Sequence, residues 1–141
     1  MSAATPAIRG VLETAIYSDD LARAKEFYGG ILGLECVLDT PRMLTFTVAA
    51  GQVLLVFRRG ATREDTETSE GVIPGHHSDG PAHFAFAIAA SDYNAWKSRL
   101  ERSGVALRSE AKWARGGRSI YFDDPDGHVV ELATPGLWPN Y

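Results

Sequence analysis

The chain repeats one pattern twice, and an internal repeat constrains the fold before any single element is assigned. Each copy opens with an alternating apolar segment, continues with a helix-like segment, passes a glycine and closes with a second apolar segment. The opening segments are residues 11–17 and 81–88, and the closing segments are residues 51–56 and 127–132. The repeat therefore predicts two modules that share one supersecondary structure.

Hydrophobic spacing predicts the same order of elements in both copies. Apolar residues alternate through each opening segment, as in a half-buried strand, and then recur at helical spacing. The pairs Asp19-Asp20 and Ser91-Asp92 precede the helical stretches and are typical helix N-caps. The expected helices cover residues 21–31 and 91–103, and the expected strands cover residues 11–17, 34–39, 43–48, 53–57, 82–88, 105–109, 118–123 and 128–133. Each module is therefore β-α-β-β-β.

This order predicts the α+β class, with two βαβββ modules forming a curved mixed sheet around a central cavity. The first module covers about residues 10–58 and the second about residues 81–134, within one domain spanning residues 1–141. The connector, residues 59–80, is polar and aperiodic. Its second half contains His76-His77 and is a candidate binding loop.

Composition and charge exclude several classes of partner. The net charge is -4 and the basic residues are scattered, so we expect no nucleic-acid partner. No apolar run approaches the roughly 18 residues that span a membrane, and the N-terminus lacks the regions of a signal peptide. Cys36 is the sole cysteine, which excludes an intrachain disulfide and a CxxC metal site. We expect a cytoplasmic protein without membrane contact whose partner is a small molecule.

Three ionisable residues occupy strand positions that should line the cavity. Alternation in residues 82–88 directs the phenylalanines toward the helix and His83 to the opposite face, and Glu13 holds the equivalent position in the first copy. Glu131 alternates with core-type residues in the last strand. Alanines on the same faces leave room for a ligand. Two carboxylates and one imidazole make a three-ligand site for a divalent cation such as Mn²⁺, Fe²⁺, Zn²⁺ or Ni²⁺.

Ordinary structural roles compete with this interpretation. A glutamate on such a face is more often solvated, and a single strand histidine is more often a hydrogen-bonded core group. Against this, an isolated buried carboxylate is costly, and a bound metal is one of few arrangements that offset the cost. Spacing alone leaves both readings open.

Three stretches resemble the vicinal oxygen chelate superfamily, also called the glyoxalase/bleomycin-resistance/dioxygenase family. They are residues 17–28 (YSDDLARAKEFY), 31–34 (ILGL) and 121–132 (YFDDPDGHVVEL), and the resemblance covers roughly residues 10–135. It implies paired βαβββ modules that form a U-shaped sheet around a metal. In that family the metal chelates two neighbouring oxygens of the substrate.

The resemblance also implies which residues hold the metal. In that family the ligands lie on the first and last strands of the modules, which by position are Glu13, His83 and Glu131 here. Many members have His or Gln in the place of Glu13. Glyoxalase I-like members have a fourth ligand where the repeat places Leu55, so a four-ligand glyoxalase site is not expected. One divalent Fe, Mn, Zn or Ni ion per site is implied.

Branches of the family imply different reactions. Ring-cleaving dioxygenases carry a tyrosine ten residues before the last ligand, where this chain has Tyr121, the candidate catalytic residue. Their upstream catalytic histidine is absent, and His77 or His76 on the connector is the candidate to replace it at the substrate. Fosfomycin-resistance transferases have a basic phosphonate pocket, to which Arg118 is the candidate contributor. A packed aromatic and a solvated arginine are the structural alternatives for Tyr121 and Arg118.

We therefore expect a metal-dependent enzyme with dioxygenase-like or lyase/transferase-like chemistry on a small oxygen-chelating substrate. The alternative is a metal-free drug-binding resistance protein of the bleomycin type, which has no use for three cavity-facing ionisable residues. One module cannot enclose a metal, so we expect a homodimer in which Glu13 of one chain joins His83 and Glu131 of the other. The apolar tail residues Leu137 and Trp138 would then cover the interface.

Overall fold

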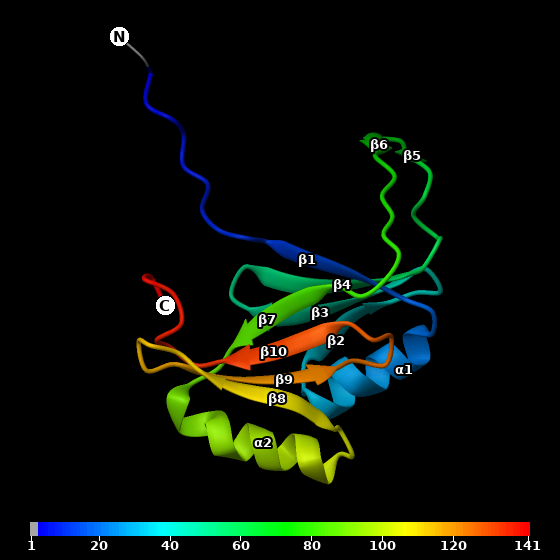
Figure 1. Ribbon diagram of the computed structural model, residues 1–141. Coiled ribbons are helices and arrows are strands. Elements are labelled where there is room, and N and C mark those ends of the chain that lie inside the picture. Colours follow the sequence, from blue (N-terminus) through cyan, green and yellow to red (C-terminus); the bar gives the residue numbers. More distant parts are fainter. Residues whose placement is uncertain (1–2) are drawn as a thin grey trace.

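The computed structural model describes residues 3–141, which form two four-stranded sheets of the same topology (Figure 1). In the first sheet the order is β1 (Glu13–Ser18), β4 (Gln52–Arg58), β3 (Met43–Ala49) and β2 (Glu35–Asp39). In the second the order is β7 (His83–Ala87), β10 (Val129–Ala133), β9 (Arg118–Asp123) and β8 (Leu107–Lys112). The first and last strands of each module pair in parallel and the other pairs are antiparallel. The α+β class and the two βαβββ modules are confirmed.

In each module, one helical segment follows the first strand and packs against the core. In the first module, helix α1 (Leu21–Lys25) continues as the π-helical turn η1 (Glu26–Ile31). In the second, the 3₁₀ turn η2 (Ala90–Asp92) leads into helix α2 (Tyr93–Arg102). Both segments end before a glycine in the left-handed region, Gly33 at φ 75° and Gly104 at φ 78°. A residue with a Cβ adopts that conformation at a cost, which explains why both copies carry glycine there.

The π-helical turn is a departure from the regular helix predicted over residues 21–31. The amide of Leu32 donates to the carbonyl of Phe27, five residues back, and widens the last turn around Gly29 and Gly30. Arg99 of α2 donates from its guanidinium to the carbonyls of Gly30 and Ile31. The charged side chain therefore partners carbonyls that face the second module.

The strand registers confirm the equivalence of the two copies. Ala15 of β1 lies opposite Leu55 of β4, and Ala85 of β7 lies opposite Glu131 of β10. The position of Leu55 in the first module is therefore the position of Glu131 in the second. Leu55 is half-buried while its neighbours in β4 point into the core, so it shares the outer face of its sheet.

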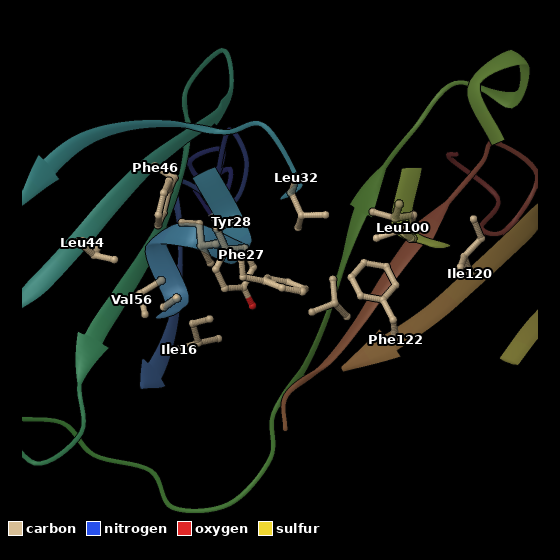
Figure 2. Packing of buried hydrophobic residues seen from close by; sticks show 14 of the residues in the cluster. Ile16, Phe27, Tyr28, Leu32, Leu44, Phe46, Val56, Leu100, Ile120 and Phe122 are labelled. Carbon is tan, nitrogen blue, oxygen red and sulfur yellow. The ribbon is translucent and has the colours of Figure 1, made fainter. Parts of the chain in front are cut away.

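The two modules pack together through their helix-bearing faces. Figure 2 shows Phe27 and Tyr28 between the two sheets. The ring of Tyr28 lies 6.0 Å from Phe46 of the first sheet, and the ring of Phe27 lies 6.0 Å from Phe122 of the second, measured between centroids. One apolar core thus serves both sheets, and their opposite faces, which carry Glu13 and the exposed alanines, turn away from it.

Two buried polar contacts lock the modules together at the β9–β10 turn. The hydroxyl of Tyr28 donates to Asp124 Oδ2 at 2.6 Å. The other carboxylate oxygen of Asp124 accepts the amide of His128, and His128 Nε2 lies 2.6 Å from the carbonyl oxygen of Tyr17. The amide of Ala82 donates to His128 Nδ1, so the proton of the neutral ring is on Nε2 and points to Tyr17. Both ring nitrogens are satisfied.

The connector is more regular than its polar sequence predicts. Strands β5 (Thr66–Thr68) and β6 (Gly71–Ile73) form a short hairpin that stands out from the two sheets (Figure 1). Val72 and Ile73 are more than half exposed on it. Strand β8 also runs three residues further than the predicted 105–109, because it continues its pairing with β9 to Lys112. Across residues 3–141, none of the helices has the length and apolar character that crossing a bilayer requires.

Removing the Tyr28 hydroxyl should loosen the contact between the modules. Tyr28→Phe leaves Asp124 Oδ2 buried without its donor, so the free energy of unfolding should fall by about 1–3 kcal/mol in urea denaturation at pH 7. Burial, and next the charge of Asp124, raise the pKa of the Tyr28 hydroxyl in the folded protein. Stability from this group is therefore present below about pH 10, where unfolded tyrosine ionises, and is lost above it. An unchanged unfolding midpoint at pH 7 would contradict the structural role.

Candidate metal centre

Two of the predicted metal ligands, His83 of β7 and Glu131 of β10, lie close together. His83 Nε2 lies 3.3 Å from Glu131 Oε1. Because β7 and β10 are paired neighbours, both side chains project from the same face of the second sheet. The His83 side chain is 53% exposed whereas that of Glu131 is 6% exposed. The carboxylate of Glu131 is therefore buried, and the imidazole of His83 lies between it and the solvent.

The hydrogen bond at the other ring nitrogen fixes the tautomer of His83. His83 Nδ1 lies 2.9 Å from the carbonyl oxygen of Val129, and a carbonyl only accepts. The Nδ1 atom therefore carries a proton, so in the neutral ring Nε2 has the lone pair and faces Glu131. A backbone carbonyl on one ring nitrogen is the usual partner of a histidine whose other nitrogen binds metal.

Glu131 is held by the neighbouring strand β9. Ser119 Oγ donates to Glu131 Oε2 at 2.5 Å, and the indole nitrogen of Trp113 donates to Ser119 Oγ at 2.8 Å. Ser119 is fully buried. One carboxylate oxygen thus accepts a hydrogen bond from within the protein, and the other, Oε1, faces His83.

Tyr121 adjoins the same two residues. It lies opposite Glu131 in the β9–β10 register, and its ring centroid is 6.2 Å from that of His83. Burial, and next the negative charge of Glu131, raise the pKa of the Tyr121 hydroxyl. The hydroxyl therefore stays protonated at neutral pH, so this arrangement suits a hydrogen-bond donor better than a base.

The third predicted ligand lies apart from this pair within one chain. Glu13 is exposed at the start of β1, in the other sheet. Within residues 3–141, no three His, Cys, Asp or Glu side chains gather closely enough to hold a metal ion. One chain therefore brings together two of the three predicted ligands, with the two outer faces turned away from a common core.

Arg118 and His77 are not brought to the His83–Glu131 pair. The guanidinium carbon of Arg118 lies 3.8 Å from the ring centroid of Tyr93 on α2, a cation–π contact on the helix-bearing side of the sheet. His77 Nε2 lies 2.9 Å from Asp79, and its ring is 5.9 Å from that of Tyr17 on β1. Arg118 is engaged with the helix, and His77 sits beside the first module.

Ser119 and Trp113 are the site residues that sequence patterns do not reveal. Ser119 occupies the same face of β9 as Tyr121, two residues earlier, and that alternation is the one signal that could identify it. Trp113 lies beyond the end of β8, in the loop 113–117, and has no periodic signature. Its approach to Ser119 comes from the path of that loop.

Comparison with known proteins identifies the family. Residues 10–132 match the Glyoxalase/Bleomycin resistance protein/Dioxygenase superfamily. The chain belongs to this superfamily. A crystal structure of lactoylglutathione lyase from Agrobacterium tumefaciens is similar to it with a TM-score of 0.85 and 32% identity, over 94% of this chain and 98% of that one.

Curated relatives include enzymes of a second kind. The metallothiol transferase FosB of Staphylococcus haemolyticus strain JCSC1435 is 27% identical over 131 residues, which cover 92% of this chain and 86% of FosB. A crystal structure of the fosfomycin resistance protein FosX from Listeria monocytogenes has the same fold, with a TM-score of 0.66 and 24% identity, over 93% of this chain and 97% of that one. The relatives named here include a lyase and a transferase.

The position of Tyr121 predicts an unusual titration. Its phenol should ionise with a pKa above the ordinary value of about 10. Because the Glu131 charge contributes to the shift, Glu131→Gln should lower that pKa toward the ordinary value. The chemical shift of the tyrosine Cζ carbon, followed by NMR against pH and assigned with Tyr121→Phe, measures both. A Tyr121 pKa at or below 10 would contradict the described surroundings.

Proposed function

We propose that this protein is a divalent-metal-dependent enzyme that acts on a small substrate bound through neighbouring oxygens, with lyase-like or transferase-like chemistry. The observation that carries the proposal is the convergence of His83 Nε2 and Glu131 Oε1 on the open face of the second sheet. The lyase and transferase among its relatives support a reaction of this general kind.

The donor set fits a divalent metal. Two ligands held at about 2.1 Å from one ion, at tetrahedral or octahedral angles, lie roughly 3.0–3.4 Å from each other. The 3.3 Å separation of His83 Nε2 and Glu131 Oε1 falls in this range. The neutral ring of His83 presents a lone pair at Nε2, and within residues 3–141 no lysine or arginine forms an ion pair with the buried carboxylate beside it. Imidazole and carboxylate suit Mn²⁺, Fe²⁺, Zn²⁺ or Ni²⁺.

The third ligand in this proposal is Glu13 from a second copy of the chain. Within one chain Glu13 lies in the first sheet and His83 in the second, and both lie on faces turned away from the shared core. Strands β1 and β7 are edge strands of their sheets, and an edge exposes unpaired backbone groups. A two-fold dimer would place the first sheet of one copy against the second sheet of the other and would create two equal sites.

The residues around the pair would bind and orient the substrate. Ala85 and Ala87 are exposed on the same face of β7, so their small side chains leave space in front of Glu131. Tyr121 would donate a hydrogen bond to a substrate oxygen, because its hydroxyl stays protonated. When bound, a divalent metal supplies Lewis-acid polarisation of the substrate oxygens.

The position of Tyr121 also supports a second candidate reaction, the ring cleavage of a dioxygenase. Ring-cleaving dioxygenases use a tyrosine at this spacing from the last ligand, and here Tyr121 lies opposite Glu131 and beside His83. Metal-free drug binding of the bleomycin-resistance type is the competing function. Metal-free drug binding does not explain why the nearly buried Glu131 faces an imidazole. The metal content of the purified protein distinguishes drug binding from the two metal-dependent reactions.

Replacing His83 should abolish metal binding without unfolding the protein. His83 is half-exposed, so His83→Ala removes a ligand and leaves the core unchanged. Divalent-metal occupancy, measured by elemental analysis after dialysis, should drop from about one ion per chain to near zero. His77→Ala is the matched control, because His77 also pairs with a carboxylate but sits beside the first module, and it should retain the metal. Equal occupancy in His83→Ala would refute the assignment.

Mixing two inactive variants tests the dimeric site. Glu13→Ala chains and His83→Ala chains each lack a ligand in both sites of their homodimers. A mixed dimer with cross-chain sites has one site with both defects and one site with all three ligands. Metal per mixed dimer, isolated with two different affinity tags, should therefore recover to about half of the wild-type value. Mixed dimers without recovered metal would show that the ligands come from one chain.

A further inference from the structure

Two hydrogen bonds in series run from the indole of Trp113 through Ser119 to Glu131. Trp113 Nε1 lies 2.8 Å from Ser119 Oγ, and Ser119 Oγ lies 2.5 Å from Glu131 Oε2. The three residues come from the 113–117 loop, β9 and β10. This series of contacts reaches the carboxylate from the side opposite to His83, because His83 faces the other oxygen.

Donor chemistry fixes the direction of both bonds. An indole N–H can only donate, so Ser119 Oγ must accept from Trp113. The one proton of the serine hydroxyl is then free for Glu131 Oε2, and 2.5 Å is the length of a strong bond from a hydroxyl to a carboxylate. The indole thus orients the hydroxyl, and the hydroxyl orients the carboxylate.

The loop that carries Trp113 is itself fixed. The amide of Trp113 donates to the carbonyl of Gly117, and the amide of Gly117 donates to the carbonyl of Gly136 in the C-terminal segment. A Cβ on Gly117 or Gly136 would lie within 2.8 Å of backbone atoms of the other segment, so only glycine permits this approach. The C-terminal segment therefore holds the indole in place.

We propose that Ser119 and Trp113 are positioning residues that hold Glu131 with Oε1 directed at His83 and Oε2 withdrawn from the metal. This inference rests on the proposed metal-dependent function. Glu131 and Ser119 are buried, so water does not readily replace a lost bond at Oε2. Without Ser119 the carboxylate loses the bond that fixes Oε2, so its binding geometry is less well set before the metal arrives.

The first test measures the affinity for Mn²⁺ alone by isothermal titration calorimetry. Ser119→Ala should weaken Mn²⁺ binding by about 10–100-fold, the usual effect of losing a residue that orients a metal ligand. Ser119→Thr keeps the hydroxyl and should stay within about threefold of wild type. Trp96→Phe is the control for tryptophan loss, because Trp96 packs against the shared core from helix α2, and it should leave the affinity unchanged.

Because the two hydrogen bonds are in series, they predict a specific result for the double variant Trp113→Phe/Ser119→Ala. Trp113→Phe should weaken Mn²⁺ binding in the wild-type background but have no further effect in the Ser119→Ala background, because the indole acts through the serine. Independent effects that add in the double variant would overturn the proposal. A merely structural role would lower the unfolding temperature of these variants and leave their Mn²⁺ affinity unchanged.

A readout without metal separates this proposal from the proposed function. The three tryptophans give three indole N–H signals in a ¹⁵N–¹H spectrum of the metal-free protein, and Trp113→Phe identifies one of them. Ser119→Ala and Glu131→Gln should each move the Trp113 signal and leave those of Trp96 and Trp138 in place. An unmoved Trp113 signal overturns the hydrogen-bond series. A responsive signal in a protein that binds no divalent ion refutes the metal-dependent function instead.

Discussion

The packing of both sheets against one helical segment is the constraint on which the rest of this structure depends. The aromatic side chains of Phe27 and Tyr28 fill the space between the sheets, and the buried bond from Tyr28 to Asp124 fixes the β9–β10 turn against the first module. Because each sheet buries its helix-bearing face in this core, its other face must point outward. The exposed position of Glu13, and the outward face shared by His83 and Glu131, follow from that single arrangement.

The two modules have the same backbone but divide the chemistry unequally. Equivalent register positions hold Leu55 and Glu131, and the partners opposite them on the next strand are Thr45 and Tyr121. The second sheet thus carries the buried carboxylate and the tyrosine beside it, whereas the first contributes Glu13 at the position of His83. The proposed site takes ligands from the outer face of a first sheet and the outer face of a second sheet. The proposed metal site therefore requires the proposed dimer.

The two carboxylate oxygens of Glu131 have different partners. Ser119 donates a hydrogen bond to Oε2 from inside the sheet, and Oε1 faces Nε2 of His83, whose other nitrogen donates to the carbonyl of Val129. Backbone and side-chain hydrogen bonds therefore prepare both groups without a bound ligand, which reduces the reorganisation that binding requires. In the proposed enzyme, Tyr121 stands beside this pair as a proton-bearing donor.

The sequence by itself determined the order of strands and helical segments within the two modules and the faces of their strands. Alternation and helical spacing are local properties, so the repeat places Glu13, His83 and Glu131 on outer faces without any knowledge of the tertiary structure. The tertiary structure alone decided which side chains meet. The contact of Trp113 with Ser119 depends on a loop held by Gly136, the stacking of Arg118 on Tyr93 depends on where α2 lies, and the short hairpin in the connector depends on pairing within a polar segment. Such contacts join residues through space, and no periodic pattern in the chain encodes them.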